Sequence, residues 1–192
     1  MNLRCSASSL ITAFFLVASF AGLWLFKAAV QAGVGIPAPE IAAKTWLNSE
    51  PKAIGRLKGK VVLVEFWTFG CYNCQNVEPY VKQWHQKYAG EGLVIVGVHS
   101  PEFGYERVLS NVQRYIRDHG IQYAIAIDND LAIWNRYQNR YWPAMYLIDK
   151  RGVIRYQRFG EGGYAQTEQQ IQTLLTERIE ARQVQPGPRT NR

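Results

Sequence analysis

One stretch of the sequence decides the fold: Val61-Val62-Leu63-Val64-Glu65-Phe66-Trp67-Thr68-Phe69-Gly70-Cys71-Tyr72-Asn73-Cys74. Its first seven residues are almost continuously apolar, which is typical of a strand buried on both faces. From Cys71 onward, apolar residues recur at helical spacing up to Tyr88, with Pro79 predicting a kink. The sequence therefore predicts a buried strand that leads straight into a helix, with a C-x-x-C pair at the junction.

Outward from this junction, apolar runs alternate with amphipathic patterns. Further strands are expected at 93–98, 123–127 and 144–148, with a hairpin return strand at 153–159. Helices are expected on the stripe of Val108, Val112 and Ile116, near Asp130, and on the stripe of Ile171, Leu174, Leu175 and Ile179. A small hairpin is expected within residues 42–59. The alternation predicts an α/β fold whose central mixed, mostly parallel sheet has helices on both faces. Ligands of such sheets bind at the carboxyl ends of strands, where Cys71 falls.

The overall composition bounds the class of protein. A chain of 192 residues is long enough for one globular domain and a short extra segment. A hydrophobic fraction of 47% with 19% charged residues excludes intrinsic disorder. The formal net charge is +7, but the basic residues are scattered, so we expect no nucleic-acid partner.

The N-terminal segment has the pattern of a membrane-targeting signal. Residues 10–26 carry no charge and would span about 26 Å as a helix, close to the lower limit for a bilayer core. Arg4 precedes this run, and Val30-Gln31-Ala32 resembles a cleavage site. We expect residues 1–32 to be a signal peptide or a signal anchor, with the anchor favoured. Residues 33–181 would then form an extracytoplasmic (periplasmic) domain, followed by a disordered tail at 182–192.

The chemistry of the domain is expected at Cys71 and Cys74. The first cysteine would lie at a helix N-terminus, where free N–H groups and the helix dipole favour a thiolate. The second would lie one turn further on, close enough to resolve a mixed disulfide. A metal half-site and an inert disulfide are the competing interpretations. A zinc site needs about four ligands, and the histidines offer no companion motif, so no metal is expected.

Several segments carry a more specific resemblance. The stretch Phe66–Cys74, with Pro79 eight residues past the first cysteine, resembles the active-site segment of the thioredoxin superfamily. The segments at 46–48, 59–64, 96–102, 141–144 and 159–164 resemble exported TlpA/ResA-like thiol–disulfide oxidoreductases, and above all the thioredoxin-like domain of DipZ-type proteins. The resemblance covers roughly residues 39–175. Tyr72-Asn73 departs from it, because thioredoxins commonly have a proline between the cysteines.

This resemblance implies a thioredoxin-like fold and a function. The protein would be a monomeric, membrane-tethered thiol–disulfide oxidoreductase that acts as a reductant and needs no cofactor. Its partners would be protein dithiols and disulfides, together with a membrane electron donor of the DipZ/CcdA kind. That donor would be a separate protein, because this chain shows no such membrane domain.

The resemblance also implies roles for residues around the two cysteines. Pro143 would be a cis-proline, and Trp142, Pro143 and Trp67 would bind the substrate. Glu65 is the one charge inside a buried strand, so it should have a raised pKa or a partner. It matches the acidic residue with which thioredoxins move the proton of the second cysteine, and Glu102 matches the active-site glutamate of ResA-like reductants.

Two other functions remain open from the sequence. A peroxiredoxin-like thiol peroxidase is suggested by Thr68-x-x-Cys71, which fits half of the P-x-x-x-T-x-x-C signature, although Val64 stands at the proline position. A non-enzymatic copper-handling protein could use Cys71 and Cys74 as soft ligands.

Overall fold

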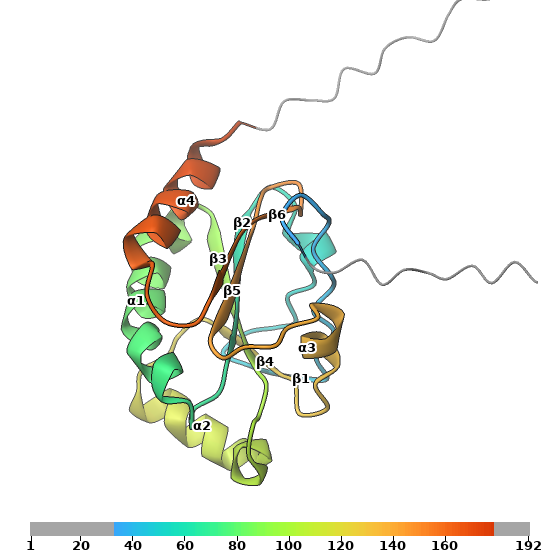
Figure 1. Cartoon of the computed structure of the whole chain (residues 1–192), viewed down its shortest axis with the longest axis vertical. Coiled ribbons are helices and arrows are strands. Elements are labelled where there is room, and N and C mark those ends of the chain that lie inside the picture. The colour runs from blue at the N-terminus through green and yellow to red at the C-terminus, as the bar shows by residue number, and fades with distance from the viewer. Residues whose placement is uncertain (1–32, 179–192) are drawn as a thin grey trace, which may run out of the picture.

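The structure is a computed structural model that describes residues 33–178 (Figure 1). Strands and helices alternate along this part of the chain. Its strands are β1 (Thr45–Leu47), β2 (Val61–Trp67), β3 (Leu93–His99), β4 (Ala124–Ile127), β5 (Ala144–Ile148) and β6 (Ile154–Phe159). Its α-helices are α1 (Tyr72–Tyr88), α2 (Leu109–Asp118), α3 (Ala132–Arg136) and α4 (Tyr164–Thr176). Short 3₁₀ turns lie at Ile54–Leu57, Ala89–Glu91 and Gly104–Arg107.

A single six-stranded sheet in the order β1-β4-β3-β2-β5-β6 forms the middle layer. Strands β2, β3 and β4 are parallel, whereas β1, β5 and β6 each join by antiparallel pairing. The predicted α/β fold with a mixed sheet is confirmed, but its parallel part is limited to three strands. After β4 the chain stays at the carboxyl edge of the sheet, passes through α3 and enters β5 from that edge, so β5 runs opposite to β2.

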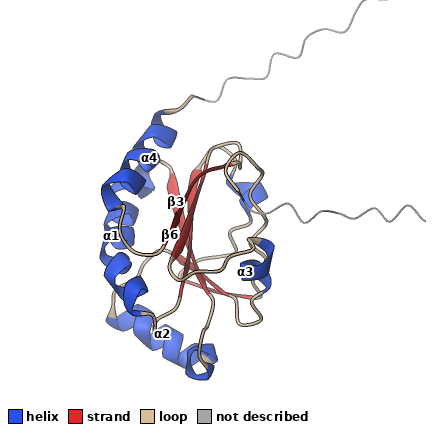
Figure 2. Ribbon diagram, in the orientation of Figure 1, coloured by secondary structure: helices blue, strands red, loops and turns tan. Residues whose placement is uncertain are grey.

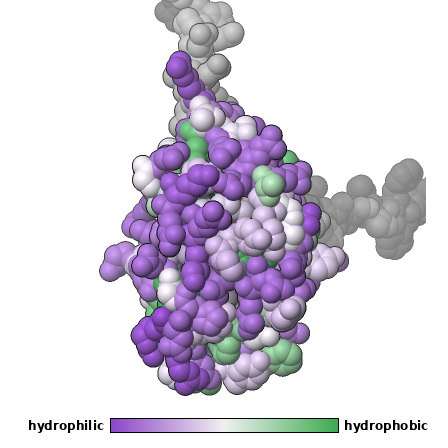
Figure 3. Space-filling view, turned by 90° about the vertical axis from the view of Figure 1, so that its left-hand side faces the viewer, coloured by the Kyte–Doolittle hydropathy of each residue, from purple (hydrophilic) through white to green (hydrophobic). Residues whose placement is uncertain are grey.

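Helices cover both faces of the sheet (Figures 1 and 2). Helices α1, α2 and α4 lie on one face and α3 lies on the other. Strand β2 is buried along its whole length, as its apolar run predicts, and its side chains alternate between two cores. Leu63 and Trp67 pack with α1, whereas Val64 and Phe66 pack on the α3 side. The outer surface of the α1, α2 and α4 layer is mostly hydrophilic (Figure 3), so their apolar faces point inward.

The hairpin expected within residues 42–59 is wrong. Strand β1 pairs antiparallel with the edge strand β4, and residues 54–57 form a 3₁₀ turn instead of a return strand. Asn48 ends β1 in a left-handed conformation, and its side-chain amide donates to the carbonyl oxygens of Ile121 and Tyr123, which lie just before β4. The segment therefore finds its partner far along the chain.

Three features stay predictions: the N-terminal targeting signal, the domain limits 33–181 and the disordered tail 182–192. Residues 1–32 lie outside the described part of the chain, as do Ile179 and the residues after it. Within residues 33–178 no helix has the length and apolar character needed to cross a bilayer. Helix α1 continues through Pro79 to Tyr88.

Candidate active site

Cys71 and Cys74 form a disulfide at the N-terminus of α1, with their Cα atoms 5.2 Å apart. Cys71 is the N-cap residue, and its Sγ accepts a hydrogen bond from the backbone N–H of Cys74 over 3.2 Å. Cys71 is half-buried, whereas Cys74 has only 3% of its surface exposed. No acidic residue occurs in the first turn of α1, so the helix N-terminus is free to stabilise a thiolate on Cys71.

Glu65 lies in β2 beneath this helix, with 2% of its surface exposed. It points to the same face of the sheet as Leu63 and Trp67, which share a core with Cys74. Burial raises the pKa of Glu65 to about 8, and the nearby Glu78 carboxylate adds to this shift. The Tyr123 hydroxyl donates a hydrogen bond to Glu65 Oε2 over 3.4 Å, and this bond lowers the Glu65 pKa. A carboxyl group that titrates near neutral pH below Cys74 is suited to proton exchange.

Glu78 is a second buried carboxylate of the site, and sequence reasoning missed it. It lies one helical turn beyond Cys74 and has 8% of its surface exposed. Its carboxyl group accepts hydrogen bonds from the Tyr115 hydroxyl over 2.8 Å and from Lys82 Nζ over 3.4 Å, and lies 3.1 Å from His119 Nδ1. The i,i+4 spacing from Cys74 was the available signal, because it puts both residues on one helix face.

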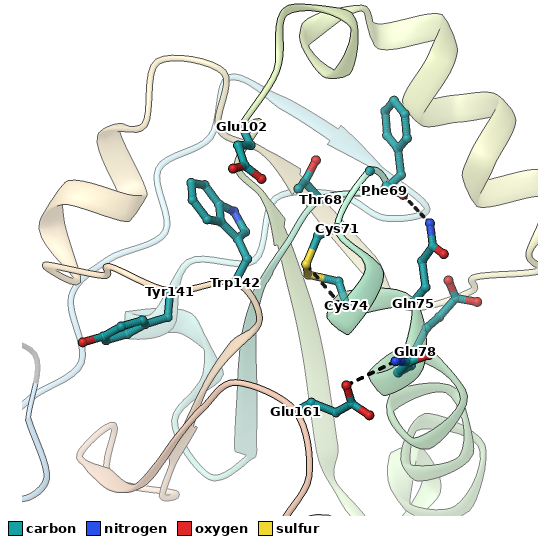
Figure 4. The surroundings of a disulfide bond; sticks show 12 residues. Thr68, Phe69, Cys71, Cys74, Gln75, Glu78, Glu102, Tyr141, Trp142 and Glu161 are labelled. Carbon is teal, nitrogen blue, oxygen red and sulfur yellow. Dashed lines mark hydrogen bonds between the residues drawn. A yellow bond between two sulfur atoms is a disulfide. The ribbon is translucent and has the colours of Figure 1, made fainter.

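Glu102 is exposed in the loop after β3, on the Trp142 side of the disulfide (Figure 4). A different acid, Glu106, is fully buried in this loop. Glu106 Oε1 accepts from the backbone N–H of Gly70 over 2.9 Å, and Oε2 accepts from the N–H groups of Glu102 and Phe103 over 2.7 and 2.8 Å. Glu106 thus ties the loop after β3 to the residue before Cys71. No sequence pattern distinguished it from Glu102.

Trp67 ends β2 and is buried beside the disulfide. Its indole fits because Gly97, on the neighbouring strand, leaves room: a Cβ there would lie 2.8 Å from Trp67 Nε1. The indole also packs edge-on against His99. His99 is buried, its Nε2 lies 3.3 Å from Thr68 Oγ1, and burial lowers its pKa to about 4. His99 is therefore a neutral ring that supports the loop before Cys71.

The Trp142–Pro143 peptide bond is cis, as the resemblance implies. Trp142 packs against the same core as Cys71, and its indole N–H donates to the Ser100 carbonyl oxygen over 2.9 Å. Figure 4 shows Trp142 on the side of the disulfide opposite to Phe69. The structure thus brings Cys71, Cys74, Glu65, Trp67 and Trp142 to one end of the sheet.

Comparison with known proteins agrees with this arrangement. Residues 34–157 match the AhpC/TSA family. The chain belongs to this family. It is 46% identical over 144 residues to Protein DipZ of Mycobacterium tuberculosis, covering 73% of this chain but 21% of DipZ. It is 30% identical over 142 residues to the thiol-disulfide oxidoreductase YkuV of Bacillus subtilis, covering 73% of this chain and 95% of YkuV.

Solved structures of thioredoxin-like proteins show the same fold. The solution structure of a thioredoxin-like protein in the oxidized form is 31% identical, with a TM-score of 0.67, covering 73% of this chain and 95% of that chain. The resemblance to the thioredoxin superfamily and to DipZ-type proteins is therefore confirmed, and YkuV among the relatives is named a thiol–disulfide oxidoreductase. The chain spans about a fifth of the length of DipZ, so the features that DipZ has beyond this region do not carry over.

Proposed function

We propose that this protein is an exported, membrane-tethered thiol–disulfide oxidoreductase that reduces protein disulfides through Cys71 and Cys74. The observation that carries the proposal is the unequal placement of the two sulfur atoms. Cys71 caps α1 and is half-exposed, while Cys74 is buried in the core that α1 forms with β2. This is the arrangement that a two-step exchange needs, with an accessible attacking thiol and a protected resolving thiol.

In the reductive direction, the Cys71 thiolate attacks one sulfur of a substrate disulfide. The substrate S–S bond breaks, a mixed disulfide with Cys71 forms, and the first substrate sulfur leaves as a thiolate that takes a proton. Cys74 then loses its proton to the Glu65 carboxylate and attacks Cys71 Sγ. The second substrate thiol leaves, the Cys71–Cys74 disulfide remains, and two electrons have passed to the substrate.

Substrate binding is proposed at the surface formed by Trp142 and the backbone before Pro143, whereas Trp67, buried beside the disulfide, would support this surface from below. Trp142 and Cys71 pack against the same core, and Tyr141 next to it is largely exposed. The backbone before Pro143 would hold the strand of the substrate that carries the reacting sulfur. Glu102, exposed on the Trp142 side, would meet the substrate or help Cys74 lose its proton.

Export is inferred from the sequence pattern of residues 1–32, and the electron donor is inferred from the resemblance to DipZ-type proteins. With residues 1–32 as a signal anchor, the catalytic domain would face the extracytoplasmic side, where disulfides persist. A membrane dithiol carrier of the DipZ/CcdA kind would then reduce the Cys71–Cys74 disulfide. A membrane-impermeant thiol reagent, applied to intact cells with a permeabilised outer membrane after reduction, should label Cys71. Labelling that requires lysis would contradict export.

The activity is tested by reduction of insulin disulfides with dithiothreitol as the electron source. The wild type should accelerate it, Cys71→Ser should abolish the acceleration, and Cys74→Ser should accumulate mixed disulfides that identify the substrates. Peroxide consumption without insulin reduction would instead support the peroxidase alternative. One contact speaks against that alternative, because the Thr68 hydroxyl already has His99 as its hydrogen-bond partner. Stoichiometric Cu(I) binding without either activity would support the copper-handling alternative.

A further inference from the structure

The buried carboxyl group of Glu65 has no direct route to solvent, although its proposed role requires it to gain and lose protons. It has 2% of its surface exposed, and its hydrogen-bond partner is the hydroxyl of Tyr123, which is buried too. Proton exchange with solvent therefore needs further groups. The described part of the chain supplies such groups on α1 and at the end of α2.

Glu78 lies between the buried site and the surface. It shares the inward face of α1 with Cys74 (Figure 4), and its negative charge adds to the upward shift of the Glu65 pKa. On its other side, His119 Nδ1 approaches both of its carboxylate oxygens, at 3.2 and 3.1 Å. The His119 side chain is 40% exposed, so its ring meets solvent. Exposure to solvent rises in the order Glu65, Glu78, His119.

We propose that Glu78 and His119 exchange the proton of Glu65 with solvent and thereby control the deprotonation of Cys74. This inference rests on the proposed function, and it adds two residues that act on the reaction, Glu78 in α1 and His119 at the C-terminal end of α2. Neither residue touches a sulfur atom. Both act through Glu65.

The proton balance of the step is simple. Two neighbouring carboxylates resist being ionised together, so the pair readily holds one shared proton. When that proton is on Glu78, Glu65 is ionised and can accept the proton of the Cys74 thiol. The pair then holds two protons, and Glu78 passes its own to His119 Nδ1. The imidazolium releases a proton to water, so one proton has moved from Cys74 to solvent and the pair again holds one.

Other charged or titratable groups also face this pair, and they set its environment. Lys82 on α1 contacts Glu78 and also donates to the backbone carbonyl of His119. Tyr115 on α2 donates to Glu78 Oε2, and the His119 ring stacks on the Tyr115 ring at 3.7 Å between centroids. Tyr123 faces Glu65 from the start of β4. Burial raises the pKa of both tyrosines, so they stay neutral and donate hydrogen bonds without carrying charge.

The test is the rate at which Cys74 resolves a preformed mixed disulfide on Cys71, measured in weak buffer over a range of pH. His119→Phe keeps a ring that can stack on Tyr115 and removes the proton acceptor. Because positioned acid–base groups contribute about 10²–10⁴-fold, we expect this variant to resolve at least about tenfold more slowly. Added imidazole should restore much of the rate. Lys82→Gln is the matched control, because it removes a different contact of Glu78 and keeps His119. Added imidazole should not change the rate at which this variant resolves the mixed disulfide.

A second measurement does not depend on catalysis. Glu78→Gln removes the charge that helps raise the Glu65 pKa, so carbon-detected NMR titration of the Glu65 carboxyl should show a lower pKa in this variant. An unchanged pKa, or a His119→Phe variant with the wild-type rate and pH profile, would overturn the proposal. A wild type that reduces no protein disulfide would instead contradict the proposed function, while the Glu65 titration would still decide whether the two carboxylates are coupled.

Discussion

The backbone N–H of Gly70 donates a hydrogen bond of 2.9 Å to the buried carboxylate of Glu106, thirty-six positions along the chain. This bond joins the loop before Cys71 to the loop after β3. The two loops also pack through Phe69 and Tyr105, whose ring centroids are 5.7 Å apart. The position of Cys71 therefore depends on a contact between segments that lie far apart in the sequence.

Gly70→Ala should disturb this contact. A Cβ at residue 70 would overlap Glu106 Oε1 and lie 2.5 Å from the Tyr105 hydroxyl. We expect a loss of about 1–3 kcal/mol in the free energy of unfolding, because overpacking a buried site has this magnitude. Urea unfolding measures the loss, and the rate of insulin reduction should fall with it. Gly104→Ala is the control, since a Cβ there meets nothing within 4 Å; equal effects of both substitutions would refute the argument.

The sequence was most informative where local pattern and burial agree. The apolar run at 61–67, the C-x-x-C and the helix after it could be predicted because strand and helix periodicities change sharply at Cys71. The buried charge of Glu65 could be singled out for the same reason, since it interrupts an apolar strand.

The sequence was less informative where the position of a residue or strand depends on contacts between segments that lie far apart in the chain. Glu106 and Glu102 are both acids in one polar loop, and only tertiary packing shows that Glu106 is buried and bound to Gly70. The partner of β1 was mispredicted because pairing with β4 joins residues about eighty positions apart. Glu78 was missed because an acid in the middle of a helix usually faces solvent.

The two cysteines should differ in reactivity when the protein is reduced. Cys71 is half-exposed at the helix N-terminus, which favours its thiolate, whereas Cys74 is buried. Iodoacetamide at mildly acidic pH should therefore alkylate Cys71 first. Fragmentation of the peptide that carries both cysteines by tandem mass spectrometry locates the label, because no Lys or Arg separates Cys71 from Cys74. Faster alkylation of Cys74 would mean that the attacking and resolving roles are reversed.

Glu65 should make the stability of the oxidised protein fall as the pH rises, most clearly between about 6.5 and about 8, because at lower pH the lowered pKa of His99 acts in the opposite direction. Glu65 has its ordinary pKa of 4.5 in the unfolded chain and a pKa of about 8 when folded. Between these values the folded protein keeps a proton that the unfolded chain has lost, so stability is lost by up to about 1.4 kcal/mol per pH unit. Glu65→Gln should remove this slope and be more stable than the wild type near pH 8.

Urea midpoints across this pH interval measure the effect of Glu65. Glu91→Gln provides the control, because Glu91 is an exposed acid and its substitution should leave the slope intact. The same pH dependence of stability in the wild type and in Glu65→Gln would show that Glu65 is ionised in the folded protein. The same Glu65→Gln substitution should slow resolution by Cys74, so stability and activity change in opposite directions.

The redox potential should be that of a reductant. Strong oxidants owe their potential to a heavily stabilised thiolate. Here the N-terminus of α1 favours a Cys71 thiolate by only about one or two kcal/mol, and Tyr72 and Asn73 add no positive charge. The carboxylate of Glu106, bonded to the residue before Cys71, opposes the thiolate. We therefore expect a potential nearer thioredoxin's (about −270 mV) than that of a strong periplasmic oxidant (about −120 mV). Equilibration with glutathione, followed by the fluorescence of Trp67, measures it; a potential above about −150 mV would make the protein a disulfide donor.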